Sequence, residues 1–354
     1  MSKTPDHLRR PPLLALTMGD PAGIGPELTL KIWQAAAQAS TRPTFDLVTY
    51  ADPGVLAACA QQAGIADPTA VVGRIEDARE LWPRRLPVLP VALARTVNPG
   101  RPDSANAGAV IAAIEQATSA VVRGEADAIV TNPIAKHVLY EAGFSHPGHT
   151  EFLAELAQRL VGNGPYLPVM MLASEELRVV PLTIHIPVAA VPRALSHDLI
   201  VKTVRIVASG LARDFGIQGQ PRIAVAGLNP HAGEGGAIGT EEQTIIAPAI
   251  AALQADGLAV TGPHSADTLF HAAARTGYDA VVAMYHDQAL IPIKTLAFDS
   301  GVNVTLGLPF VRTSPDHGTA FDIAGRGIAN PSSLDAALRL GARLANNRAA
   351  AGVS

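Results

Sequence analysis

With 354 residues, 48% of them hydrophobic and 16% charged, the chain is typical of a compact α/β enzyme with a large aliphatic core in one large or two medium domains. Its net charge of −4 argues against a nucleic-acid partner, and its single cysteine, Cys59, excludes an intramolecular disulfide and a cysteine-based zinc cluster. No apolar run approaches the length of a membrane span, so we expect no membrane partner and a cytoplasmic location.

The first half of the chain alternates short apolar runs with helical patterns. After a polar tail over residues 1–12, Leu13–Met18 predicts a strand, and the loop GDPAGIGPE leads into a helix predicted over 27–39. This loop matches neither G-x-G-x-x-G nor the Walker pattern, so an anion-binding turn and a tight packing turn both remain open. The other predicted elements are strands at 45–50, 87–97 and 128–131 and helices at 53–64 and 105–123. This alternation predicts a doubly wound α/β sheet.

The second half continues the pattern. His149 and Thr150 precede an amphipathic run, so Thr150 is a candidate cap of a helix over 151–161. The amide groups at that helix start would suit a phosphate or carboxylate, and a plain capped helix with an exposed histidine is the alternative. The other predicted elements are strands at 169–173, 179–186, 223–228, 279–286 and 301–310 and helices at 196–215, 240–255 and 334–346.

Three histidines, His185, His231 and His286, each follow an apolar run that resembles a buried strand. In open α/β sheets, ligands bind just beyond the carboxyl ends of the strands. Neutral imidazoles are common ligands of zinc and related ions, and three of them leave coordination positions for substrate oxygens. These histidines therefore predict one divalent metal site, against the alternative of unrelated loop histidines. Asp287 could orient His286 or simply cap a turn.

Further polar residues cluster in the same part of the sequence. Asp267 is a candidate metal ligand or general base, and Lys294 is a candidate acid or base. Asn303 interrupts an apolar strand, where a polar side chain needs a partner. Lys294, Asn303 and Arg312 near one pocket would suit a small polyanion, whereas each alone could be an ordinary surface residue.

The chain carries in order the strings GDPAGIGPE, VTNPIAK, GHTEFLAE, LNPHAGEGG, ADTLF, MYHDQ, GVNVTLGLPFVRTSPDHGTA and AGRG. Over about residues 13–344 it thereby resembles the 4-hydroxythreonine-4-phosphate dehydrogenase family of pyridoxine biosynthesis. The resemblance implies a two-domain α/β/α fold like that of isocitrate and isopropylmalate dehydrogenases, with an active-site cleft between the domains. It implies a first domain over 1–135 and 315–354 and a second, with the metal ligands and dimer contacts, over 136–314.

The implied reaction is oxidation of 4-phosphooxy-L-threonine at its C3 hydroxyl by NAD or NADP, followed by decarboxylation to 3-amino-2-oxopropyl phosphate. The resemblance implies a homodimer with the active site at the subunit interface, so that His185 could come from the partner, and one zinc, magnesium or cobalt ion per site. Lys294 would assist proton transfer, with Asp267 as a second catalytic candidate. The implied metal ligands are His185, His231 and His286, and the implied substrate contacts are His149, Thr150, Lys294, Asn303 and Arg312.

Three alternatives to this reaction stay open. The first is a dehydrogenase of the same superfamily that acts on D-threonate or D-erythronate 4-phosphate or on an aromatic cis-dihydrodiol, and it would keep the three histidines. The second is a metal-dependent lyase or hydrolase that uses no nucleotide. The third is a catalytically inactive binding protein. The sequence leaves the nucleotide-contacting residues unknown.

Overall fold

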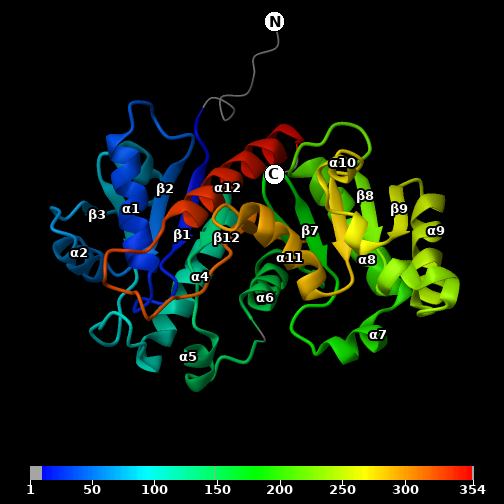
Figure 1. The fold of residues 1–354 in the computed structure, drawn as a ribbon. Helices are drawn as coiled ribbons and strands as arrows, with labels where there is room; N and C mark the ends of the chain where they lie inside the picture. Colours follow the sequence, from blue (N-terminus) through cyan, green and yellow to red (C-terminus); the bar gives the residue numbers. More distant parts are fainter. Residues whose placement is uncertain (1–9, 147, 353–354) are drawn as a thin grey trace, which may run out of the picture. The chain divides into compact units, whose positions relative to one another are not determined.

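The computed structural model describes residues 10–146 and 148–352, so most of the expected polar tail lies outside the described residues. The chain divides into two compact units. Unit 1 combines the residues up to 168 with those from 308 onward, and unit 2 is the continuous segment 169–307 (Figure 1). The expected division had the same discontinuous form, but with crossings at 135 and 315. Residues 136–168 join unit 1 because the helix at 149–161 packs against the one at 107–122.

Unit 1 is built on a parallel sheet with the strand order β3-β4-β2-β1-β5-β12. The central strand β1 is buried along its whole length, which matches its unbroken apolar sequence LLALT. The strands are β1 (Leu13–Thr17), β2 (Asp46–Ala51), β3 (Thr69–Val71), β4 (Leu86–Pro90), β5 (Ala128–Thr131) and β12 (Arg312–Pro315).

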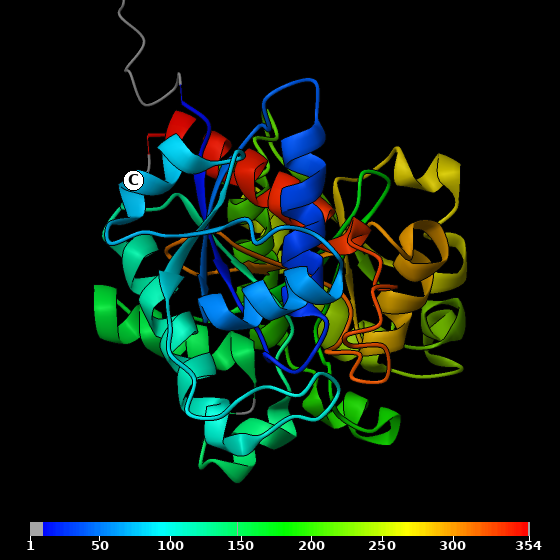
Figure 2. The same ribbon diagram turned by 90° about the vertical axis from the view of Figure 1, so that its left-hand side faces the viewer.

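Helices pack on the central strands of this sheet. Both α4 and α12 contact β1 and β5; α1 lies beside α12, and α6 lies beside α4 (Figure 2). The helices of unit 1 are α1 (Gly25–Gln38), α2 (Pro53–Gln62), α3 (Ala78–Leu81), α4 (Ala107–Val122), α5 (Lys136–Glu141), α6 (His149–Val161) and α12 (Ser332–Ala350).

One helical segment corrects the expectation about membrane spans. Ser104–Val122, which is α4 with its preceding turn, is long and apolar enough to cross a membrane by length and composition. In the fold, Ala113, Ile114 and Ala117 of this helix are fully buried, and the helix packs on β1, β2 and β5. Its apolar character is therefore explained by its place in the core of unit 1.

Unit 2 contains a mixed sheet with the order β11-β6-β7-β10-β8-β9. The pairs β11–β6 and β6–β7 are antiparallel, and the pairs from β7 to β9 are parallel. Its core includes Leu172, Val179, Val281 and Leu290. The strands are β6 (Val169–Ala173), β7 (Arg178–Pro181), β8 (Arg222–Ala226), β9 (Ala259–His264), β10 (Ala280–Ala283) and β11 (Val302–Leu306), and the helices are α7 (Val191–Ala194), α8 (His197–Arg213), α9 (Ala247–Ala255), α10 (Ala272–Arg275) and α11 (His286–Ala297).

Several predicted boundaries were wrong near the site. The predicted strands 179–186 and 279–286 end early, at Pro181 and Ala283, and His286 instead begins α11. The extended segment predicted at 87–97 ends at Pro90. The described structure also contains α11, β9 and β12, which the sequence did not predict. The mixed α/β fold class itself is confirmed.

Candidate active site

Two of the three candidate metal ligands lie together in unit 2. His185 follows β7 and His286 begins α11 after β10, and these two strands are parallel neighbours. The loops that leave their carboxyl ends therefore emerge at the same edge of the sheet. The ring centroids of His185 and His286 are 6.0 Å apart with an angle of 41° between the ring planes. The structure thus brings together two of the three histidines that the sequence predicts as metal ligands.

Asp287 orients the second of these rings. The Nδ1 atom of His286 lies 2.7 Å from Oδ1 of Asp287. A carboxylate that holds Nδ1–H leaves Nε2 as the nitrogen that can bind a metal, and such partners raise the basicity of the ligand. Of the two roles considered for Asp287, the geometry supports orientation of His286.

His231 lies in an unusual turn of unit 2. His231, Ala232, Gly233, Glu234 and Gly235 all have positive φ angles, between 44° and 79°. Left-handed backbone costs roughly 1–2 kcal/mol for each residue that carries a Cβ atom, so this turn needs outside support. A strained turn of this kind is more typical of a functional loop than of a passive connection.

That support comes from Glu242, a buried residue that the sequence analysis missed. One carboxylate oxygen of Glu242 accepts hydrogen bonds from the backbone N–H groups of Leu228 and Asn229, both at 2.7 Å. The other carboxylate oxygen accepts one from the Asn229 side chain at 3.0 Å. A Cβ atom on Gly233 would lie 2.6 Å from Glu242, so glycine is required there. The carboxylate thus fixes the chain immediately before His231.

Gln288 connects the loops that carry His231 and His286. Its Nε2 atom donates to the carbonyl of Gly227 at 2.8 Å, and its Oε1 atom accepts from the N–H of Met284 at 2.7 Å. The hydroxyl of Thr183, two residues before His185, donates to the carbonyl of Met284 at 2.8 Å. One set of hydrogen bonds therefore joins all three histidine loops at their bases.

The three histidines do not form a complete metal site in a single chain. Within residues 10–146 and 148–352, no three His, Cys, Asp or Glu side chains are grouped so that they could hold one ion. The pair His185 and His286, with its oriented Nε2 atom, is chemically suited to supply part of a divalent-metal site. The hydrogen bond from Ser265 is the main cause that holds the pKa of Asp267 below its usual range. Asp267 is therefore a carboxylate at neutral pH.

Lys294 and Asn303 also lie in unit 2. Lys294 is two turns after His286 on α11, and its ammonium group is 5.6 Å from the Phe298 ring centre. Asn303 is on β11, and its Oδ1 atom is buried without a hydrogen-bond partner in the described part of the chain. A buried amide oxygen in this state is expected to take a donor from a ligand or water.

In unit 1, Arg312 and its surroundings form a separate group of candidates. Arg312 is the first residue of β12, beside β5, and it is 4% exposed. Its Nη2 atom donates to the hydroxyl of Thr131 at 2.8 Å. Burial lowers the pKa of Arg312 to about 10, so the guanidinium still carries its charge at neutral pH. It is thus a fixed cation suited to an anionic group.

His149 begins α6 in the same unit. The helix cap is Gly148 and not Thr150, which lies inside the first turn, so the predicted cap was wrong. The Nε2 atom of His149 is buried without a hydrogen-bond partner among the described residues. Burial, followed by the charges of Arg312 and Lys136, holds the pKa of His149 well below its usual range. The ring is therefore neutral at pH 7.

Lys136, which the sequence analysis did not propose as a site residue, completes this group. A Cβ atom on Gly148 would lie 3.1 Å from Nζ of Lys136 and 2.9 Å from a carboxylate oxygen of Glu151. The side-chain ends of Lys136 and Glu151 therefore lie beside the first residues of α6. Two cations, a neutral imidazole and a helix N-terminus thus face one region of unit 1, an arrangement that suits a phosphate or carboxylate.

The structure explains the glycines of GDPAGIGPE by packing. Gly19 has a φ of +70°, and a Cβ atom there would lie 2.5 Å from the Pro133 carbonyl oxygen. A Cβ atom on Gly25 would lie 2.6 Å from the Met18 carbonyl oxygen. The side chain of Asn132 donates to the Thr17 carbonyl at 3.0 Å and ties the two loops together. Of the two open readings of this loop, these contacts support the tight packing turn.

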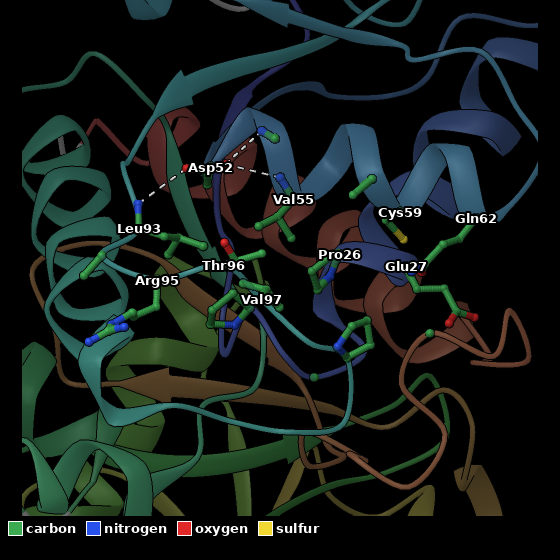
Figure 3. A pocket seen from close by; sticks show the side chains of 17 residues that line it. Pro26, Glu27, Asp52, Val55, Cys59, Gln62, Leu93, Arg95, Thr96 and Val97 are labelled. Atoms are coloured by element: carbon green, nitrogen blue, oxygen red, sulfur yellow. Dashed lines mark hydrogen bonds between the residues drawn. The ribbon is translucent and has the colours of Figure 1, made fainter.

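A cavity of about 430 Å³ lies elsewhere in unit 1, between α1, α2 and the segment after β4 (Figure 3). Its lining residues all belong to this unit, and they include Pro26, Asp52, Val55, Cys59 and Thr96. Burial raises the pKa of the Cys59 thiol to about 11, so this cysteine is not a thiolate nucleophile at neutral pH.

Comparisons with known proteins agree with this fold. The family model described as pyridoxal phosphate biosynthetic protein PdxA matches residues 44–341. A 4-hydroxythreonine-4-phosphate dehydrogenase of Methylorubrum extorquens is 56% identical over 338 residues, which cover 95% of each chain. The crystal structure of an enzyme of the same name from Klebsiella pneumoniae is 37% identical, with a TM-score of 0.82 and coverage of 95% of this chain and 98% of that one. A terephthalate 1,2-cis-dihydrodiol dehydrogenase structure from Burkholderia xenovorans is 29% identical, with a TM-score of 0.62 and coverage of 94% and 98%.

Proposed function

Because this chain belongs to the family of pyridoxal phosphate biosynthetic proteins PdxA, we propose that it is an NAD(P)-linked dehydrogenase of 4-phosphooxy-L-threonine. The reaction oxidises the C3 hydroxyl, reduces the nicotinamide cofactor, and releases CO₂ to leave 3-amino-2-oxopropyl phosphate. The observation that carries the proposal is the 56% identity to a relative of that name over nearly the whole chain. The paired imidazoles suit a divalent cation, and the group of Arg312, Lys136 and His149 suits a phosphate.

The histidines would hold a divalent cation such as zinc, magnesium or cobalt. His185 and His286 supply two ligands, and His231, on its strained turn, supplies the third. When bound, such an ion polarises the hydroxyl oxygen and stabilises the negative charge that develops on it during oxidation and decarboxylation. Asp287 keeps the Nδ1 atom of His286 occupied, so that only Nε2 of that ring is offered to the ion.

The phosphate of the substrate is held by charged and polar groups of this chain. Arg312 offers parallel hydrogen bonds, and the first amides of α6, with Thr150 in the first turn, offer further donors. His149 is neutral, so it contributes one N–H donor without adding charge. The buried Oδ1 atom of Asn303 accepts a hydrogen bond from the substrate amino group.

Proton transfer is assigned to Lys294 and Asp267. Lys294 lies on the same helix as His286, close enough in sequence to face the same bound substrate. Asp267 has a lowered pKa and is ionised, so it serves as a proton acceptor rather than a donor at neutral pH. Replacement of Lys294 by Met should lower kcat more than it raises KM, because the proposed role is in the chemical step.

The active site is completed in a homodimer. Among the described residues, a single chain groups His185 with His286 but gathers no third ligand, so we propose that the partner subunit supplies one histidine of the set. Light scattering should give twice the chain mass of 36.6 kDa.

Mixing two inactive variants tests the shared site. His185→Ala and His231→Ala homodimers, unfolded and refolded together, should recover about a quarter of the wild-type activity, because half of the dimers are hybrids with one intact site of two. Each variant refolded alone is the control. An inactive mixture that contains hybrid dimers would contradict the shared site.

The substrate is tested by reduction of NAD⁺ and NADP⁺, measured at 340 nm with a divalent metal present. We expect 4-phosphooxy-L-threonine to give the highest kcat/KM. D-threonate 4-phosphate, D-erythronate 4-phosphate and an aromatic cis-dihydrodiol carboxylate are the competing substrates. A clear preference for any of these three would overturn the proposed substrate while leaving the chain a dehydrogenase of the same superfamily.

A further inference from the structure

The turn that carries His231 has to be held in shape by its own surroundings in unit 2. Its five left-handed residues include His231, Ala232 and Glu234, for which this backbone is unfavourable because they carry a Cβ atom. Within the described part of the chain, no third His, Cys, Asp or Glu joins His185 and His286 in a group that could hold an ion. The other proposed ligands therefore do not fix His231 in a single chain.

Asn229 is the anchor of this turn, two residues before His231. Its backbone N–H donates to one carboxylate oxygen of Glu242 at 2.7 Å, and its side-chain amide donates to the other oxygen at 3.0 Å. The same amide nitrogen donates to the Glu241 carboxylate at 2.8 Å. Pro230 follows, and its ring restricts the backbone between the anchor and His231. Two carboxylates thus fix the residue from which the turn starts.

Glu242 reaches the anchor from a π-helical turn, Glu242–Ile246, that precedes α9. Such turns are rare and are frequently found at functional sites. The Glu242 side chain is enclosed by the loop that it bonds. A Cβ atom on Gly227 would lie 3.2 Å from one of its oxygens, and a Cβ atom on Gly233 would lie 2.6 Å from the other. The carboxylate is therefore built into the base of the His231 turn.

The turn also packs against glycines on either side of it. A Cβ atom on Gly227 would lie 3.0 Å from both Cα and Cβ of Ala232, and a Cβ atom on Gly239 would collide with the Asn229 side chain. Neither position leaves room for a side chain. All of these contacts are made by the chain itself, so the turn is formed without an ion. A preformed ligand turn lowers the ordering cost of binding.

We propose that Glu242 is a positioning residue of the metal site, which acts through Asn229 to hold His231 ready for an ion before the site is complete. The inference rests on the proposed function, because it takes His231 as a ligand. Residues that lock the geometry of a metal ligand raise the affinity of the site. Both Glu242 oxygens are occupied by the chain, so the loss of Glu242 should lower metal affinity without removing a reacting group.

The test is calorimetric titration of the metal-free protein with Zn²⁺ and Co²⁺. Glu242→Gln keeps the shape of the side chain and one acceptor oxygen, but its NH₂ group opposes the Asn229 amide. Asn229→Ala removes the same contact from the other side and serves where Glu242→Gln does not fold. We expect each variant to weaken metal binding by about ten- to a hundredfold, the range found for residues that support metal ligands.

Asp279→Asn is the matched control. Asp279 is a partly buried carboxylate of the same unit that accepts a hydrogen bond from the Arg222 backbone N–H at 2.7 Å. It lies at the amino ends of β8 and β10, whereas the histidine loops follow the carboxyl ends. This variant should lower the melting temperature and leave metal affinity unchanged. A Glu242→Gln protein that behaves in the same way would show that Glu242 has only a structural role, and would overturn the inference.

Glu234→Gly tests whether Glu242 acts through the turn. Glu234 is exposed and has a φ of 44°, which glycine adopts freely. Added to Glu242→Gln, this change should recover roughly threefold or more of the lost metal affinity, because the turn then needs less support. A double variant that binds metal no better than Glu242→Gln would contradict an action through the turn.

Hydrogen exchange of the metal-free wild type provides a readout without any ion. The backbone N–H groups of Leu228 and Asn229 should exchange slowly, because both are bonded to the buried Glu242 carboxylate. Fast exchange that becomes slow only after Zn²⁺ is added would show that the ion shapes the turn, and would overturn the inference.

His231→Ala separates this inference from the proposed function. If His231→Ala weakens metal binding while folded Glu242→Gln and Asn229→Ala bind metal as the wild type does, the inference fails and the proposed ligand stands. If His231→Ala itself binds metal with wild-type affinity, the proposed ligand set fails and the inference fails with it.

Discussion

Arg312 is a buried cation that suits an anionic ligand. A guanidinium that is 4% exposed carries a large desolvation cost, and its Nη2 atom donates a hydrogen bond to the Thr131 hydroxyl. Charge-assisted hydrogen bonds are worth about 1.5–3 kcal/mol, so loss of the guanidinium should raise KM by roughly ten- to a hundredfold. Arg312→Met keeps most of the side-chain volume and is the variant of choice. Steady-state kinetics provide the measurement, with Arg84→Met, an exposed arginine, as control. A KM within twofold of wild type would remove Arg312 from the substrate site.

The burial of His149 predicts how the stability of the folded protein depends on pH. Its pKa in the folded protein is well below the ordinary value of 6.5, so the unfolded chain binds a proton that the folded chain does not. The free energy of unfolding should therefore fall as the pH decreases below about 6.5, by at most about 1.4 kcal/mol per pH unit from this group.

The variant His149→Gln removes the titrating group and retains a neutral donor. Urea unfolding between pH 7.5 and 5 should show a shallower loss of stability in the variant than in the wild type. His197→Gln, at an exposed histidine on α8, should leave the slope unchanged. If the free energy of unfolding fell equally with pH in His149→Gln and in the wild type, the His149 ring would be protonated in the folded protein.

At the scale of elements, the three histidine loops depend on bonds between their bases. Gln288 joins the loops of His231 and His286 through Gly227 and Met284. Gln288→Glu keeps the acceptor for Met284 but loses the donor to the Gly227 carbonyl. Because partners that orient metal ligands typically contribute ten- to a hundredfold in affinity, we expect metal binding to weaken by about that factor.

The matched control for this change is Gln254→Glu. Gln254 also donates to a backbone carbonyl, that of Val260 at 2.8 Å, but it lies on α9 and joins no histidine loop. Calorimetric titration with Zn²⁺ or Co²⁺ should separate the two variants, while their melting temperatures should be similar. Equal metal affinity in both would show that Gln288 has only a structural role.

Elements with a clear period were predictable, and elements that depend on distant contacts were not. The strand β5 was predicted with its observed bounds, because three apolar residues and Thr131 end at the turn signal Asn132-Pro133. Helix α11 contains Pro292 in its interior, and β12 is short and polar at Thr313 and Ser314, so neither has the usual pattern of its class.

The candidate site likewise contains residues that the sequence pattern indicated and residues whose roles depend on distant contacts. His185 and His286 could be paired because both follow apolar runs. Lys136, Glu242 and Gln288 could not be found, because their roles depend on loops that are brought together only by the fold. Sequence reasoning proposed the candidate chemical side chains and missed most of the residues that the structure shows holding their loops in place.

At the scale of the whole molecule, the stability of unit 1 depends on α12, the last helix of the chain. Unit 1 is assembled from two separate segments, and α12, at the end of the second, packs on β1, β5 and β12. Leu334, Leu338 and Leu344 of this helix are buried. Burial of one leucine side chain contributes about 2 kcal/mol, so these three alone approach the 5–15 kcal/mol that stabilises a typical domain. Deletion of residues 332–354 should therefore unfold unit 1.

Fluorescence can report on that unit alone, because both tryptophans, Trp33 and Trp82, lie in it. Trp82 is buried, and its Nε1 atom donates to the Phe45 carbonyl at 3.0 Å. After deletion of 332–354, tryptophan emission should shift to the wavelength of the unfolded chain, while far-UV circular dichroism should retain part of its helical signal from unit 2, whose chain is continuous and has its own core. Deletion of residues 352–354 alone removes no part of α12 and should change neither signal. Native tryptophan emission in the longer deletion would show that the first segment of unit 1 folds without α12. In that case α12 would contribute little to the stability of unit 1.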